Sequence, residues 1–117
     1  APTDADVSET VTPSEVLLFR YSALTFNGHR IHYDRRYASD VEGYDGLVVH
    51  GPLTATLLAE LAADTGGELA TFSFRGVSPL LDTAPFSIHG RRSESGMDLW
   101  AANPSGGLAM TANATFR

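Results

Sequence analysis

The chain contains no cysteine and no lysine among its 117 residues. The lack of cysteine excludes disulfides, thiolate zinc sites and a cysteine nucleophile. The lack of lysine excludes Schiff-base chemistry and the phosphate-binding lysine of a P-loop. All 8 basic residues are arginines, so an anionic ligand has to be bound by arginine, by backbone N–H groups or by a helix end.

Long apolar runs and positive charge are also scarce. No run of about 18 apolar residues occurs, so the sequence predicts no membrane span. Residues 1–9 are too polar and acidic to resemble a signal peptide. The 14 acidic residues outweigh the 8 basic ones and give a net charge of −6, the opposite of the balance found in nucleic-acid-binding domains. We therefore expect a cytoplasmic protein without a nucleic-acid or membrane partner.

The remaining composition is that of a globular domain. Hydrophobic residues make up 43% of the chain and charged residues 19%, which suffices for one modest core. We expect a single domain over residues 1–117, of which residues 1–6 form a loose tail.

The first third of the chain predicts short elements. A weak polar–apolar alternation over residues 7–11 indicates a short strand. The run Thr12-Pro13-Ser14-Glu15 has the pattern of a capping box with Thr12 as the N-cap, and it predicts a helix over 13–24. Residues 34–39 are compatible with one short helical turn.

A long apolar helix is predicted in the centre of the chain. Pro52 suits the first turn of a helix, so this helix begins near His50 or Gly51, and the Gly66-Gly67 pair ends it. Its residues are apolar on nearly all sides, which is typical of a buried helix.

The second half of the chain alternates with a period of two. This alternation predicts half-buried strands within residues 70–75, 86–89, 97–101 and 108–116. The intervening segments 92–96 and 103–107 are rich in hairpin-loop residues. One long helix followed by consecutive antiparallel strands predicts an α+β hot-dog fold, in which a curled sheet wraps round the buried helix. Because such a sheet leaves an edge and a face uncovered, we expect an oligomer.

Two segments contain residues suited to chemistry, Asn27–His32 (NGHRIH) and Val48–Pro52 (VVHGP). Gly51, at the start of the long helix, offers a backbone N–H that a ligand can approach, and such a donor stabilises an oxyanion. An imidazole such as that of His32 titrates near neutrality and is a natural proton carrier. Asn27 can hold a water molecule but cannot act as a base.

Both segments resemble those of a known enzyme family. Residues 19–34 (FRYSALTFNGHRIHYD) resemble the hydratase motif of the MaoC-like (R)-specific enoyl-thioester hydratases, and residues 47–53 (LVVHGPL) resemble the start of their central helix. The resemblance covers about residues 7–117, including the spacing between the two motifs. In the family pattern D-x-N-P-(L/I)-H an acid and a histidine lie five residues apart. Here Asn27 takes the place of the acid, and His32 that of the catalytic histidine.

The departures from this pattern, Asn27 and the pair His29-Arg30, are similar to those of type 2 hydroxyacyl-thioester dehydratases and of bacterial mesaconyl-, itaconyl- and methylfumaryl-CoA hydratases. The resemblance implies a lyase that reversibly adds water across a 2-enoyl thioester of CoA or acyl-carrier protein. We expect no cofactor, and no metal because no carboxylate near His29, His32 and His50 has the spacing of a metal ligand. It also implies roles for three residues. His32 transfers protons, Asn27 holds the water, and the Gly51 N–H binds the thioester oxygen.

Further residues of the two segments are candidate substrate ligands, with a surface or packing role as the alternative for each. These candidates are His29, Arg30, Tyr33 and His50. An arginine fork suits both the phosphates of CoA and an acyl carboxylate, which makes Arg30, Arg35 and Arg36 candidates for binding either anion.

The resemblance also bears on partners. The chain resembles the motif-bearing half of a double hot dog, so we expect a second half from another copy, another subunit or a further part of the polypeptide. Two alternative functions stay open. A hot-dog thioesterase would use the Gly51 donor but direct water at the thioester carbon, whereas a non-catalytic hot-dog subunit would assist a catalytic partner.

Overall fold

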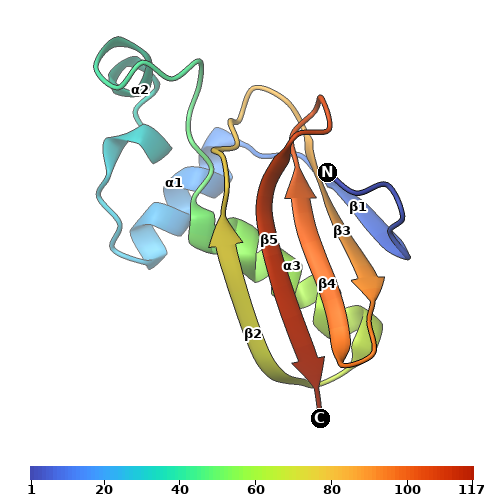
Figure 1. Cartoon of the computed structure of the whole chain (residues 1–117). Helices are drawn as coiled ribbons and strands as arrows, with labels where there is room; N and C mark the ends of the chain where they lie inside the picture. The colour runs from blue at the N-terminus through green and yellow to red at the C-terminus, as the bar shows by residue number, and fades with distance from the viewer.

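The computed structural model describes all residues, 1–117. Figure 1 shows one sheet, one long helix and a group of shorter helices. In chain order the elements are β1 (Val7–Val11), α1 (Glu15–Leu24), the 3-10 helix η1 (Arg30–His32), α2 (Arg35–Asp40), α3 (Gly51–Gly66), β2 (Leu69–Gly76), β3 (Phe86–Arg92), β4 (Gly96–Ala102) and β5 (Leu108–Phe116).

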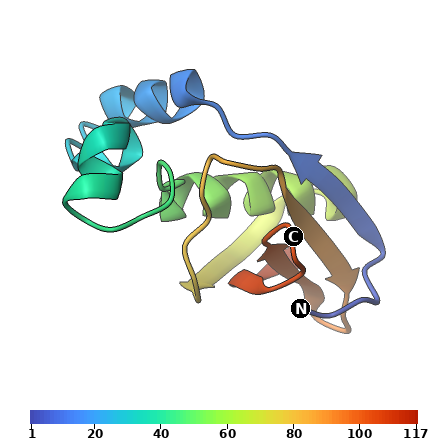
Figure 2. The same cartoon turned by 90° about the horizontal axis from the view of Figure 1, so that it is seen from above.

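The sheet has 5 antiparallel strands in the order β1-β3-β4-β5-β2, and α3 crosses one of its faces (Figures 1 and 2). Strands β3, β4 and β5 are joined by hairpins at the two predicted loops. In the second hairpin the Asn103 side chain accepts hydrogen bonds from the N–H groups of Ser105 (3.0 Å) and Gly107 (2.8 Å). The predicted hot-dog architecture, a curled sheet round one long helix, is confirmed.

The core lies between α3 and the sheet. Leu58 and Leu61 of α3 pack with inward-facing strand residues such as Ile88 and Leu99 in one hydrophobic cluster. The predicted burial of α3 holds except for a single exposed stripe, formed by Pro52, Thr56, Glu60 and Asp64. Residues four apart lie on one face of a helix, so this stripe is the side turned away from the core.

Strand β2 is more exposed than its alternation suggests. Ala70 is exposed, and Phe74 keeps 52% of its surface accessible. The reason is its position at the edge of the sheet, where only β5 pairs with it. An edge strand lacks a neighbour on one side to cover its residues.

Helix α1 begins later than predicted, because Ser14 and not Thr12 is its N-cap. The Ser14 hydroxyl accepts a hydrogen bond from the Leu17 N–H at 3.1 Å, which satisfies one of the free donors of the first turn. Glu15 therefore closes no capping box, and its carboxylate binds Arg35 instead.

The end of α1 turns the chain sharply into the segment 27–32. The Asn27 N–H donates to the Ser22 carbonyl at 2.8 Å and the Phe26 N–H to the Ala23 carbonyl at 3.3 Å. This is the pattern of a Schellman motif, whose left-handed position normally holds glycine. Here it holds Phe26, with φ of 54°.

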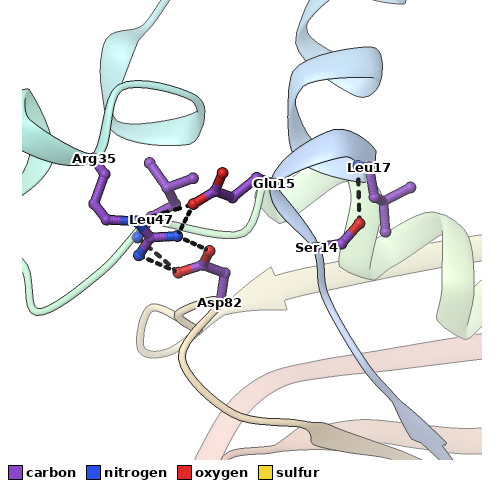
Figure 3. Close-up of polar contacts among 6 residues, drawn as sticks. All are labelled: Ser14, Glu15, Leu17, Arg35, Leu47 and Asp82. Atoms are coloured by element: carbon purple, nitrogen blue, oxygen red, sulfur yellow. Dashed lines mark hydrogen bonds and ion pairs between the residues drawn. The ribbon is translucent and has the colours of Figure 1, made fainter.

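Helices α1, η1 and α2 form a lobe that projects beyond one end of α3 (Figure 2). Arg35 ties this lobe to the rest of the molecule (Figure 3). Its guanidinium lies 2.6 Å from Glu15 and 2.6 Å from Asp82, and Asp82 also accepts from the Leu47 N–H at 3.0 Å. Arg35, a candidate anion ligand, is thus occupied in joining α1, α2 and the loop between β2 and β3.

Residues 1–6, expected to be a loose tail, run beside β3. Asp4 forms an ion pair with Arg91 at 2.8 Å, and the Asp6 N–H donates to the Gly90 carbonyl at 2.8 Å. No helix in the structure combines the length and apolarity needed to cross a membrane.

Candidate active site

The ring of His32 is buried at the end of η1 and has a defined tautomer. Its Nδ1 atom lies 2.6 Å from the carbonyl oxygen of Val48. Because a carbonyl oxygen only accepts, Nδ1 carries the proton, and the neutral ring keeps a free lone pair on Nε2. Burial lowers the pKa of His32; the Val48 hydrogen bond opposes this, and nearby His29 lowers the pKa further. The ring is therefore held in the form that can take up a proton.

Gly51 presents a free donor at the first position of α3. Its N–H has no acceptor within the protein, since the first hydrogen bond of the helix runs from the Thr54 N–H to the His50 carbonyl (3.1 Å). A Cβ atom added to Gly51 would meet nothing within 4 Å. Pro52 has no N–H to offer, so Gly51 is the donor most accessible at the positive end of the helix dipole.

His32 and Gly51 line the same cleft, which has a volume of about 340 Å³. The predicted base and the predicted oxyanion donor are thus brought together by segments 19 residues apart in sequence. The remaining lining is mainly apolar and carries no charged side chain: Val48, Val49, Thr54, Gly76, Val77, Ser78, Pro79, Leu80, Ala109 and Met110.

Thr54 is a cleft residue that the sequence reading missed. Its side chain is almost fully buried, with 2% of the residue exposed, and its hydroxyl makes only a long contact of 3.4 Å to the His50 carbonyl. The signal was available, because Thr54 lies three residues after Gly51 and hence on the same side of the helix. The hydrophobic pattern does not distinguish Thr54 from its neighbours, because the helix is apolar on nearly all sides.

His50, predicted as a substrate ligand, does not line the cleft. The residue has 0% exposure and stacks face to face on His32, with ring centroids 3.8 Å apart and planes inclined by 18°. Its Nε2 lies 2.7 Å from the Ser22 hydroxyl. With no exposed surface and no place in the cleft lining, His50 has the packing role that the sequence analysis gave as its alternative, and substrate contact by this residue stays a prediction that the structure does not support.

Asn27 lies beside a second hollow rather than in the cleft of His32. That hollow, of about 310 Å³, is lined by Phe19, Ser22, Ala23, Phe26, Asn27, Gly28 and Tyr33. The Asn27 Oδ1 atom accepts from the His29 N–H at 3.1 Å, as in an Asx turn. Its Nδ2 group has no partner within the protein and remains free to donate.

The three other predicted substrate ligands also lie outside the cleft. Arg30, in η1, binds Asp34, the N-cap of α2, at 2.8 Å and covers the ring of Tyr37 at 4.3 Å. Tyr33 donates to the Gly28 carbonyl at 3.0 Å, and His29 is half-exposed with its ring nearly perpendicular to that of His32. Within this chain, none of them is placed to bind a molecule in the cleft.

Comparison with known sequences assigns the family. The sequence model of the family described as hydroxyacyl-thioester dehydratase type 2 matches residues 1–82. The chain belongs to this family. It is 53% identical to the mesaconyl-C(4)-CoA hydratase of Chloroflexus aurantiacus over 112 residues, which is 95% of the chain and 40% of that protein. It is also 39% identical to the mitochondrial hydroxyacyl-thioester dehydratase type 2 of Schizosaccharomyces pombe, over 66% of the chain and 27% of that protein.

Solved structures confirm the fold of this family member. A MaoC-like dehydratase from Phytophthora capsici superposes with a TM-score of 0.83 at 13% identity, over 100% of the chain and 43% of that protein. The (R)-hydratase of A. caviae gives 0.78 at 16% identity, over 98% of both chains. A HadBC (3R-hydroxyacyl-ACP dehydratase) complex chain from Mycobacterium tuberculosis gives 0.74 at 16% identity, over 92% and 88%. The chain spans less than half the length of both curated relatives.

Proposed function

We propose that the chain carries the catalytic site of a lyase that adds water reversibly across the double bond of a 2-enoyl thioester. The observation that supports this is the position of His32 and Gly51 on one cleft. The names of the curated relatives, a CoA hydratase and a hydroxyacyl-thioester dehydratase, point to the same reaction class.

The proposed reaction uses the free atoms of these two residues. The thioester carbonyl oxygen accepts a hydrogen bond from the Gly51 N–H, so the negative charge of the enolate-like transition state develops next to a donor. Water lies at Nε2 of His32. As its oxygen attacks C3, Nε2 takes one proton, and the resulting imidazolium returns a proton to C2 on the same face. Water is added across the double bond, and His32 returns to its neutral form.

Asn27 lies beside the second hollow and not in the cleft of His32, so this proposal gives it no part in the proton transfers. Its Oδ1 is occupied by the His29 N–H, while Nδ2 has no partner. An amide nitrogen cannot accept a proton, so both proton transfers fall to His32. Where relatives of the MaoC-like pattern place an acid, this chain therefore relies on one titrating group.

The cleft also bears on the acyl group. A short apolar acyl group fits this cleft, because no charged side chain lines it. A dicarboxylic acyl group, such as the one in the name of the Chloroflexus relative, has a free carboxylate that this lining cannot neutralise. We propose short enoyl thioesters as substrates, with any second carboxylate directed out of the cleft or towards a partner subunit. CoA and acyl-carrier protein are both possible carriers.

We further propose that a second hot-dog unit packs against this one, which for this chain alone means a homodimer. Strand β2 offers an open edge, and Phe74 and Val77 beside it are 52% and 53% exposed. Unpaired backbone groups next to apolar side chains favour pairing with another strand. The curated relatives are more than twice as long as this chain, and the HadBC dehydratase of M. tuberculosis is a complex. Sedimentation analysis tests this, with a monomer at micromolar concentration as the contrary result.

A panel of enoyl-CoA substrates tests the reaction itself. The enoyl thioester chromophore reports hydration, and a thiol reagent reports release of free CoA. We expect loss of enoyl absorbance without free thiol in the wild type, and neither in His32→Ala. Thiol release would instead indicate a thioesterase, and hydration at the wild-type rate by His32→Ala would refute the proposed mechanism.

A further inference from the structure

His50 is the most deeply buried polar side chain next to the cleft, and its ring is only partly satisfied. The residue has 0% exposure, and its Nδ1 atom has no hydrogen-bond partner. A buried nitrogen without a partner is unfavourable, so an apolar ring would fill this position at lower cost. The advantage of an imidazole at this position therefore has to come from its other atoms, Nε2 and the ring face.

Those atoms join three separate elements at one point. The Nε2 of His50 lies 2.7 Å from the hydroxyl of Ser22, which belongs to α1. One ring face stacks on His32 of η1 at 3.8 Å, and Tyr21 of α1 lies 4.7 Å away at an angle of 59°. The hydrogen bond to Ser22 restricts rotation of the His50 ring. Because the ring of His32 packs flat against it, the plane of His50 in turn restricts the plane of His32.

The backbone of the same residue fixes the other half of the site. His50 is the N-cap of α3, and its carbonyl accepts the first hydrogen bond of the helix from the Thr54 N–H at 3.1 Å. The next N–H along the chain is that of Gly51. One residue thus sets the orientation of the imidazole through its side chain and that of the donor amide through its main chain.

We propose that His50, held by Ser22, is a positioning residue that sets the plane of the His32 ring relative to the Gly51 N–H. It touches no substrate. This inference rests on the proposed function and adds a residue pair to it.

The charge state of the stacked pair His32 and His50 fits a positioning role for His50. Burial and, to a lesser extent, the neighbouring His32 together lower the pKa of His50 to about 4. The titratable groups that face the pair are Tyr21 on His50 and His29 on His32, and no carboxylate bonds to either ring. A neutral His50 leaves His32 free to gain and lose a proton, because two imidazolium rings would repel at this separation.

Replacement of the Ser22 hydroxyl tests the inference at the smallest structural cost. Ser22→Ala removes the hydrogen bond but keeps the stacked ring, and Ser22→Thr keeps a hydroxyl. We expect Ser22→Ala to lower kcat for hydration about tenfold with KM within twofold of the wild type, and Ser22→Thr to restore most of the loss. His50→Phe, which keeps a stacked ring without the nitrogen, should resemble Ser22→Ala.

His89 supplies a matched control. It also bonds two serines, Ser8 at 2.6 Å and Ser87 at 2.8 Å, and stacks on Trp100, but it lies away from the cleft. His89→Phe should lower stability without changing kcat. If folded Ser22→Ala and His50→Phe keep the wild-type kcat and differ only in melting temperature, His50 is a packing residue and the inference fails.

A spectroscopic readout separates this inference from the proposed function. The Nδ1–H of His32, bonded to the Val48 carbonyl, should give a downfield proton resonance in the wild type that broadens or disappears in Ser22→Ala and persists in His89→Phe. This result is required even if no enoyl thioester proves to be a substrate. An unchanged resonance in Ser22→Ala would overturn the positioning role, whereas an inactive wild type with the expected resonances would overturn only the reaction.

Discussion

The Nδ1 atom of His32 lies 2.6 Å from the carbonyl oxygen of Val48, two residues before His50 and three before Gly51. This bond links the 3-10 helix η1 to the segment that leads into α3. It fixes the tautomer of His32, a residue that lines the same cleft as Gly51. The proposed base and the proposed oxyanion donor are therefore positioned by one short stretch of backbone.

Removal of the imidazole tests its role as the proton carrier. We expect His32→Ala to lower kcat for enoyl-thioester hydration by roughly 10²–10⁴-fold, the usual contribution of a general acid–base. His32→Gln retains a side-chain amide that can still bond Val48 but cannot carry a proton, so it should be equally inactive. Stopped-flow absorbance of the enoyl thioester measures both. Activity in His32→Gln near the wild-type level would show that the ring serves only to hold the loop.

Loss of the Gly51 donor can be separated from loss of the fold. Proline is favoured at the first helical position, and His50 already has the extended conformation that precedes a proline (φ −60°, ψ 133°). Gly51→Pro therefore removes an N–H that the fold does not use. We expect kcat to fall on the order of 10²–10³-fold, as on loss of an oxyanion donor, with a melting temperature close to that of the wild type.

The control for this variant is Gly51→Ala, which keeps the N–H and whose Cβ meets nothing within 4 Å. It should retain more activity than Gly51→Pro. The reverse order would indicate that space, and not the N–H donor, is what Gly51 provides.

The pH dependence of activity follows from the buried state of His32. Its pKa is lowered from the ordinary value of 6.5, mainly by burial. Because the neutral ring is the active form, kcat/KM should be constant near pH 7 and fall only as the pH drops through a value below 6.5. A profile of kcat/KM against pH, measured in overlapping buffers at constant ionic strength, tests this. An acidic limb centred above pH 7 would contradict the assignment of His32 as the base.

Stability should decline over a related pH range. Burial lowers the pKa values of His32, His50 and His89, that of His50 to about 4. In the unfolded chain these rings take up protons near pH 6.5, whereas the folded state resists protonation. Their contribution is therefore complete above pH 6.5 and is lost as the pH falls towards 4. Urea unfolding at pH 7, 5.5 and 4.5 should show this decline, and His50→Phe should reduce it.

The Arg35 contacts predict how the lobe is held in place. Arg35→Ala would leave the buried Asp82 carboxylate, 4% exposed, with only the Leu47 N–H as a partner. Because Arg35 is itself half-exposed, we expect a modest loss of about 1–2 kcal/mol in unfolding free energy. Arg36→Ala, on the same helix without an ion pair, should change little. Chemical denaturation measures the unfolding free energy of both variants. Equal losses for the two substitutions would contradict the role of Arg35 in holding the lobe to the rest of the molecule.

Much of this site could be predicted because its parts are local. The His32 and Gly51 segments carry distinctive residues at fixed spacings, and the strands from β3 to β5 alternate plainly. The N-cap of α1 was misplaced because Thr12 and Ser14 both have a hydroxyl suited to capping, and only the path of the chain after β1 selects Ser14. Similarly, Arg30 looks the same in the sequence whether it meets a ligand or, as here, Asp34.

The sequence by itself determined the type of fold and supplied the two chemical groups of the proposed site, since periodicity and turn residues act over a few positions. Only the tertiary structure decided which side chains face the cleft. It buried His50 behind His32, brought Thr54 to the lining and placed Asn27 beside a second hollow. These outcomes depend on how η1, α1 and α3 pack together, and packing between distant segments leaves no local pattern in the chain.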